Sequence, residues 1–139
     1  FFFKQKTAYE IYQCDWSSDV CSSDLNIFAR ILRGEIPCKK VHEDDHTLAF
    51  HDIRPQAPVH VLVIPKGAYV SMDDFHAKAS DAEIAALGRA IGKVARLSGV
   101  VDGGYRIIAN NGANGHQEVP HLHFHVLGGR PLGRMLAKD

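Results

Sequence analysis

Residues 121–127 read His-Leu-His-Phe-His-Val-Leu, a run in which histidine alternates with apolar side chains. Successive side chains of an extended strand point to opposite faces, so His121, His123 and His125 would share one face of a strand. The apolar residues between them would share the other. The plainer alternative is a buried strand whose histidines are only structural, but three at alternating positions make that reading the weaker one.

Two chemistries suit such a row, a metal site and a phosphate-reactive site. Alternate residues of a strand lie about 6.7 Å apart, whereas zinc needs each nitrogen within about 2.1 Å, so adjacent pairs could chelate but all three would be strained. A neutral imidazole is a competent nucleophile toward phosphorus, and a neighbouring imidazole can fix its tautomer or donate a proton. His123, flanked on both sides, is the expected nucleophile.

The flanking segments favour phosphate. Gly128-Gly129-Arg130-Pro131 follows the run with a permissive turn and a cation. A stretch rich in Asn and Gly, residues 110–115, precedes it with amides and backbone N–H groups. Alone this stretch would be read as an ordinary loop, but beside three histidines it is expected to line the site.

The histidine run resembles the signature of the histidine triad (HIT) superfamily, whose members bind nucleotides and react at the α-phosphate. The resemblance extends over residues 26–139 and is nearest the HINT branch. The uridylyltransferase branch has glutamine at the position of His125, and the dinucleoside-polyphosphate hydrolase branch lacks the Gly-Gly-Arg turn. The matching stretches are Ile27–Pro37, Phe50–Pro58, Leu62–Lys66, Gly115–His121 and Gly128–Gly133.

This resemblance implies a role for each matching position. His123 would attack the α-phosphate, while His121 and His125 would hold its tautomer and contact the phosphate or leaving group, with His60 supporting them. Asp52 would accept the ribose hydroxyls. The purine slot would consist of Ile27, Phe28, Ile31, Phe50 and Ile53, and the phosphate end would be lined by Asn110, Gln117 and Val119.

The implied activity is that of a homodimeric purine nucleoside phosphoramidase, which forms a nucleotidyl-histidine intermediate and releases a nucleoside monophosphate. The substrate would be a purine nucleotide or nucleoside phosphoramidate. A hydrolase of dinucleoside polyphosphates or acyl-adenylates, a nucleotide-binding regulatory module and a metalloenzyme remain as alternatives.

The chain departs from the family pattern at several positions. His116 stands where the family usually has glycine, and Glu118 where some members have serine. The positions of the Cys-x-x-Cys zinc clip found in some relatives hold Asn26 and Ala29, so we expect no metal and no cofactor.

Residues 1–25 lack helical or strand periodicity, and their back-translation resembles sequencing-adapter and read-primer sequences. We therefore expect 1–25 to be a non-native, disordered segment that replaces the true N-terminus, and 26–139 to be one HIT domain.

The composition of residues 26–139 is nearly neutral, with 14 basic and 12 acidic side chains, so neither nucleic acid nor an anionic membrane is an expected partner. Two of the three cysteines fall in 1–25, leaving Cys38 alone and no expected disulfide. There is no membrane-spanning apolar run or visible signal peptide, and we expect a cytoplasmic protein.

Periodicity and turn signals predict an α+β domain with a HIT-like fold. It would contain a short N-terminal helix, one main helix and about five mostly antiparallel strands. Ser80 and Glu83 form a capping-box pattern for the main helix, whose apolar face would run through Ile84, Leu87, Ile91, Val94 and Leu97. The short helix would include residues 27–32, and the strands would lie at 39–43, 47–52, 59–64, 105–109 and 121–127.

Overall fold

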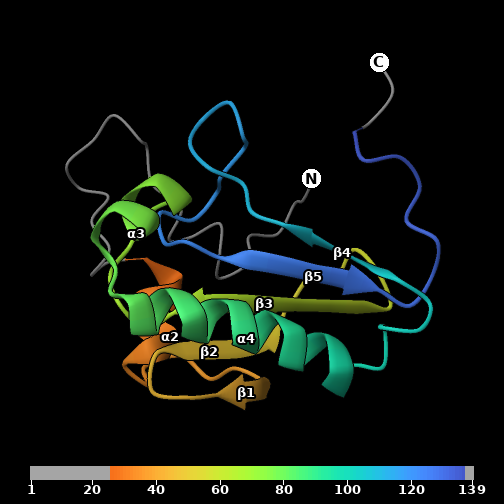
Figure 1. Ribbon diagram of the computed structural model, residues 1–139, viewed down its shortest axis with the longest axis horizontal. Helices are drawn as coiled ribbons and strands as arrows, with labels where there is room; N and C mark the ends of the chain where they lie inside the picture. Colours follow the sequence, from red (N-terminus) through yellow and green to blue (C-terminus); the bar gives the residue numbers. More distant parts are fainter. Residues whose placement is uncertain (1–25, 137–139) are drawn as a thin grey trace.

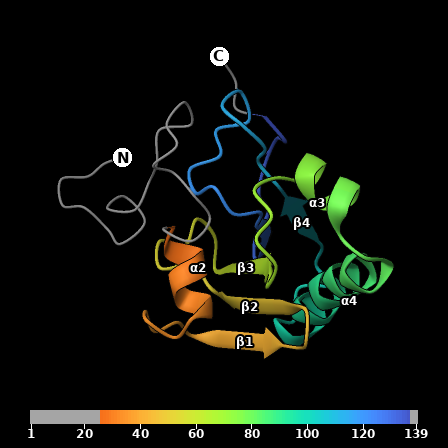
Figure 2. The same cartoon turned by 90° about the vertical axis from the view of Figure 1, so that its left-hand side faces the viewer.

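The computed structural model describes residues 26–136, which form a five-stranded antiparallel sheet with helices on both faces (Figures 1 and 2). The spatial order is β1 (Lys40–Glu43), β2 (Thr47–His51), β3 (Val59–Pro65), β5 (Phe124–Gly128) and β4 (Tyr105–Ile108). The predicted α+β class and the count of five strands are therefore confirmed. Within the described residues, no helix is long and apolar enough to cross a membrane.

The main helix, α4 (Asp81–Leu97), covers one face of the sheet (Figure 1). Its capping box is complete, because Glu83 N–H donates to Ser80 Oγ over 3.1 Å and Ser80 N–H donates to Glu83 Oε1 over 2.9 Å. The centre of its predicted apolar face is buried against the sheet. The prediction was wrong at the two ends, since Ile84 and Leu97 are 39% and 59% exposed in the first and last turns.

Helix α2 (Ile27–Leu32) packs on the opposite face of the sheet, as Figure 2 shows. The Asn26 side chain begins this helix by accepting a hydrogen bond from Ala29 N–H over 2.8 Å. Phe28 then packs edge-on against Phe50 of β2, with ring centroids 5.7 Å apart. The short helix predicted here is confirmed.

Helix α3 (Met72–Lys78) was not predicted. It begins at Ser71, whose hydroxyl caps Asp74 N–H, and it buries Phe75 against the α4 side of the sheet. Seven residues give too few turns for a helical period to stand out in sequence. The Ser71 cap, followed by two aspartates in the first turn, is the signal that could have located it.

The histidine run is extended, but only its second half belongs to the sheet. Strand β5 begins at Phe124 rather than at the predicted His121. The preceding residues bond elsewhere, because Leu122 N–H donates to Tyr69 O and His121 N–H donates to Val119 O, each over 2.8 Å. The predicted alternation still holds for the apolar side chains, since Leu122, Phe124 and Val126 all pack in the core beneath α4.

Residues 1–25 and 137–139 lie outside the described part of the chain. The adapter-derived segment and the domain boundary at residue 26 therefore stay predictions.

Candidate active site

The sheet brings imidazoles from two neighbouring strands together. His125 of β5 lies directly opposite Leu62 of β3. His60 precedes Leu62 by two positions, so its side chain lies on the same face of the sheet. This diagonal arrangement places His60 Nε2 2.9 Å from His125 Nδ1. The ring of His123 lies next to that of His125, with centroids 5.0 Å apart. Three of the four predicted catalytic histidines thus form one contiguous group.

His121 contributes to this group through its backbone. Its carbonyl accepts a hydrogen bond from His123 Nδ1 over 2.7 Å, which places the proton of neutral His123 on Nδ1 and leaves a lone pair on Nε2. The imidazole of His121 is buried and donates from Nε2 to Pro65 O over 2.9 Å. The group that fixes the His123 tautomer is therefore the backbone carbonyl of His121 and not its imidazole.

A second hydrogen bond fixes the protons of the other two rings. The N–H of Gln56 donates to His60 Nδ1 over 3.0 Å, so the proton of neutral His60 lies on Nε2 and is donated to His125 Nδ1. His125 consequently carries its own proton on Nε2. The site therefore combines a lone pair on His123 Nε2 with an N–H donor on the adjacent His125.

Burial keeps these imidazoles neutral. It lowers the pKa of His60 and of His125 to about 4, and the nearby His60 adds to the shift at His125. Burial, together with His125, lowers the pKa of His123 to about 3. At neutral pH the Nε2 lone pair of His123 is thus free of a proton.

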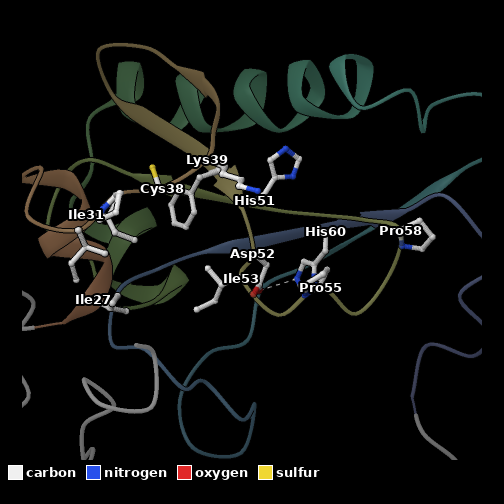
Figure 3. A pocket seen from close by; sticks show the side chains of 13 residues that line it. Ile27, Ile31, Cys38, Lys39, His51, Asp52, Ile53, Pro55, Pro58 and His60 are labelled. Atoms are coloured by element: carbon white, nitrogen blue, oxygen red, sulfur yellow. Dashed lines mark ion pairs between the residues drawn. The ribbon is translucent and has the colours of Figure 1, made fainter. Parts of the chain in front are cut away.

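Asp52 follows β2 and approaches the same group, with Oδ2 3.4 Å from His60 Nε2 (Figure 3). Burial raises the pKa of this carboxyl to about 6, and the charge of Glu118 adds to the rise. A hydrogen bond from Arg54 N–H and the Arg54 charge oppose the shift. Asp52 is thus ionised at pH 7, beside a neutral His60.

Asp52, His60 and His125 also offer ligand atoms that all lie within 4.8 Å of one another, a spacing that a metal ion could use. A metal ligand must present an unprotonated nitrogen. The Gln56 N–H keeps the proton on His60 Nε2, the atom that faces the other two groups. The donor set therefore suits hydrogen bonding better than ligation.

A cavity of about 780 Å³ opens beside Asp52 and His60 (Figure 3). Four predicted slot residues line it, namely Ile27, Ile31, Phe50 and Ile53. The other predicted slot residue, Phe28, does not line the cavity but packs in one buried cluster with Ile27, Ile31 and Phe50, and its ring centroid lies 4.9 Å from that of His123. Phe28 thus contacts both the apolar cluster behind the cavity and the ring of His123.

Sequence reasoning assigned no role to seven residues that line the cavity, namely Ile36, Pro37, Cys38, Lys39, His51, Pro55 and Pro58. Lys39 O accepts a hydrogen bond from His51 N–H over 3.0 Å, so the segment before β1 reaches the cavity by pairing with the end of β2. No local pattern marks such residues. His51 lies in the stretch Phe50–Pro58 that resembles HIT proteins, but the resemblance implied no role for it.

The predicted phosphate end of the site is a loop that hydrogen bonds of the Gln117 side chain hold in place. Gln117 is buried, accepts from Gly112 N–H over 2.9 Å, and donates to Val70 O and Val119 O over 2.7 and 2.9 Å. Its amide thus holds the loop that leads to the histidines, while Val119 joins the buried cluster of the slot. Half-buried Asn110 lies two residues beyond Ile108, which pairs with His125.

The two departures from the family pattern lie side by side on this loop. His116 has a φ of 60° and is the one non-glycine residue with positive φ among the described positions. Its Nε2 lies 3.1 Å from Glu118 Oε2, and both side chains are exposed. The unusual backbone conformation is the one that glycine adopts without strain.

This sheet, with neutral imidazoles at the end of an apolar cavity, is that of a histidine triad protein. A family model described as HIT domain matches residues 33–132, and the chain belongs to the HIT family.

Its curated relatives include a purine nucleoside phosphoramidase of Escherichia coli K12, 47% identical over 118 residues that span 83% of this chain and 96% of the relative. An uncharacterized 13.2 kDa HIT-like protein of Azospirillum brasilense is 67% identical over 113 residues, 81% of this chain and 93% of the relative.

Among solved structures, a HIT family hydrolase from Clostridium thermocellum aligns with a TM-score of 0.73 and 38% identity, covering 79% of this chain and 96% of that one. A histidine triad protein from Clostridium difficile aligns with a TM-score of 0.70 and 43% identity, covering 79% and 95%. At family level the chain is thus similar to HIT hydrolases.

Proposed function

We propose that this protein is a HINT-type purine nucleoside phosphoramidase that works through a covalent nucleotidyl-histidine. The observation that carries the proposal is the bond from His123 Nδ1 to the His121 carbonyl, which leaves the His123 Nε2 lone pair free. The similarity to the E. coli phosphoramidase supports the choice of substrate class.

In the proposed reaction His123 Nε2 attacks the α-phosphorus, and the P–N bond to the amine breaks as the new N–P bond forms. The leaving nitrogen takes up a proton from solvent and departs as the amine, while the His125 Nε2–H donor contacts the phosphate or the departing group. Water then attacks the phosphorus and the N–P bond breaks, which restores the His123 Nε2 lone pair and releases the nucleoside monophosphate. The proton that water loses in this step returns to solvent. No metal enters these steps.

The nucleoside would bind in the cavity beside these histidines. Its ribose hydroxyls would donate to ionised Asp52, and the purine would lie between Ile27 and Ile53. Asn110 and the loop held by Gln117 would surround the phosphate. An apolar slot of this size is large enough for a nucleoside.

We also propose a homodimer formed through the edge strand β4. Exposed apolar side chains gather along this strand and the end of α4, namely Leu97, Val101, Tyr105 and Ile107. Pairing of two β4 edges would cover them and remove an open sheet edge. Light scattering of the purified chain tests this assembly. The cytoplasmic location stays a prediction.

The direct test is hydrolysis of adenosine phosphoramidate by the full chain and by its His123→Ala variant, each with and without a chelator. We expect chelator-resistant turnover that disappears in the variant. A folded wild-type chain that binds AMP without turnover would instead indicate a nucleotide-binding module, and preferential hydrolysis of a dinucleoside polyphosphate would indicate the alternative hydrolase.

A further inference from the structure

The turn that follows β5 is fastened to the loop that precedes β3. The Arg130 guanidinium donates from Nη2 to Gln56 O over 3.1 Å. One residue earlier, Gly129 has a φ of 93°, and a Cβ at this position would lie 2.8 Å from Pro58 Cβ. Two adjacent residues of the turn thus contact loop 52–58, one by a hydrogen bond and one by close packing.

Loop 52–58 in turn determines where the protons of the imidazole pair lie. Gln56, whose carbonyl accepts from Arg130, uses its N–H to donate to His60 Nδ1. His60 Nε2 then donates to His125 Nδ1. A displaced Gln56 N–H would release His60 Nδ1, and the ring could then carry its proton on either nitrogen. His125 would no longer be held as an Nε2–H donor.

We infer that Arg130 is a positioning residue, which acts through the backbone of Gln56 to hold His60 and His125 in the tautomers that the reaction needs. The guanidinium also donates from Nη1 to its neighbour Pro131 O over 3.0 Å, so both of its recorded bonds go to backbone carbonyls. A cation beside a histidine run would ordinarily be assigned to the phosphate. These bonds assign Arg130 to the loop instead.

The test is to replace Arg130 with methionine, which keeps much of the side-chain length but removes the donors, and to record the ring nitrogen NMR shifts of His60 and His125. We expect wild type to show single Nε2–H tautomers and Arg130→Met to show mixtures at both rings. Arg130→Lys, which retains a donor, should lie nearer wild type. Arg106→Met is the matched control, because Arg106 donates to the carbonyls of Gly133 and Arg134 and not to loop 52–58.

Kinetics provide the second measurement, and this part rests on the proposed function. For adenosine phosphoramidate we expect about a tenfold lower kcat in Arg130→Met with little change in KM, since proton positioning and not substrate binding is affected. Unchanged tautomers in Arg130→Met would overturn the inference, whatever the activity. Tautomer mixing in a chain that hydrolyses no phosphoramidate would support the inference while the proposed function fails.

Discussion

Asp52 is the residue whose ionisation should shape the pH profile. Its carboxyl has a pKa of about 6, whereas the pKa values of His60, His123 and His125 are lowered to about 4 or below. If ionised Asp52 accepts the ribose hydroxyls, kcat/KM should fall as the pH drops through 6, because protonation removes the acceptor charge.

The Asp52→Asn variant tests this assignment. We expect kcat/KM at pH 7 to be roughly ten- to a hundredfold lower, the loss of one or two hydrogen bonds to a charged group. The kcat/KM of this variant for adenosine phosphoramidate should be nearly independent of pH between pH 5 and 7. An unchanged acid limb in the variant would assign that limb to another group.

His116 makes a prediction about stability. An L-residue with a φ of 60° is strained by roughly 1–2 kcal/mol, while glycine loses roughly 0.5–1 kcal/mol more backbone entropy on folding. His116→Gly should therefore raise the free energy of unfolding by up to about 1 kcal/mol in urea denaturation. His116→Ala keeps the strain, so an equal gain there would show that the backbone is not the cause.

Part of the residue-level site was predictable. The histidine row, Asp52 and most of the apolar slot follow from side-chain identity and from the resemblance to HIT proteins. The groups that fix the tautomers do not, because the His121 carbonyl and the Gln56 N–H are backbone atoms that every sequence carries. Gln117 and Arg130 were expected near the phosphate, but the hydrogen bonds described above join both side chains to backbone groups of the surrounding loops.

Among the helices and strands, α4 has a complete capping box, which fixes where the helix begins. Ser80→Ala removes the hydroxyl that accepts from Glu83 N–H and should lower the free energy of unfolding by about 1 kcal/mol. Thermal and urea denaturation measure the change. Ser80→Asp should restore most of it, because aspartate accepts the same bond and favours a helix N-terminus. Equal losses in both variants would mean that the cap is not the stabilising contact.

The elements also show which sequence signals are reliable. Helix α4 has both a cap and a sustained apolar period, so its start at Asp81 was located correctly. The period could not show that Ile84 and Leu97 remain exposed. The start of β5 was placed three residues early because Leu122 N–H bonds to Tyr69 O and His121 N–H to Val119 O instead of to a strand, an effect that alternation does not reveal.

For the whole molecule, the buried imidazoles imply an acid-sensitive fold. The pKa values of His60, His123 and His125 are lowered on folding, so the unfolded chain takes up more protons as the pH falls below about 6.5. The three imidazoles therefore contribute fully to the free energy of unfolding at neutral pH, and this contribution is lost as the pH falls toward 4. Asp52 acts in the opposite sense, since its raised pKa lets the folded state bind a proton between about pH 6 and 4.

The three imidazoles outnumber the one carboxyl, so the net effect is destabilising in acid. We expect the free energy of unfolding to fall by about 2 kcal/mol for each pH unit between pH 6.5 and 5. Urea denaturation at constant ionic strength measures it. A free energy of unfolding that stays constant or rises over this range would show that folding does not lower the pKa values of these imidazoles.

The central claim is that His123 becomes covalently bound to the nucleotide. The most direct measurement is mass spectrometry of the full chain, denatured during turnover of adenosine phosphoramidate and then digested. We expect an added adenylyl group on the peptide that contains His123, and no such group on the corresponding peptide of His123→Ala. Turnover by a wild-type chain that never carries the adduct under rapid quench, or an adduct on another residue, would contradict it.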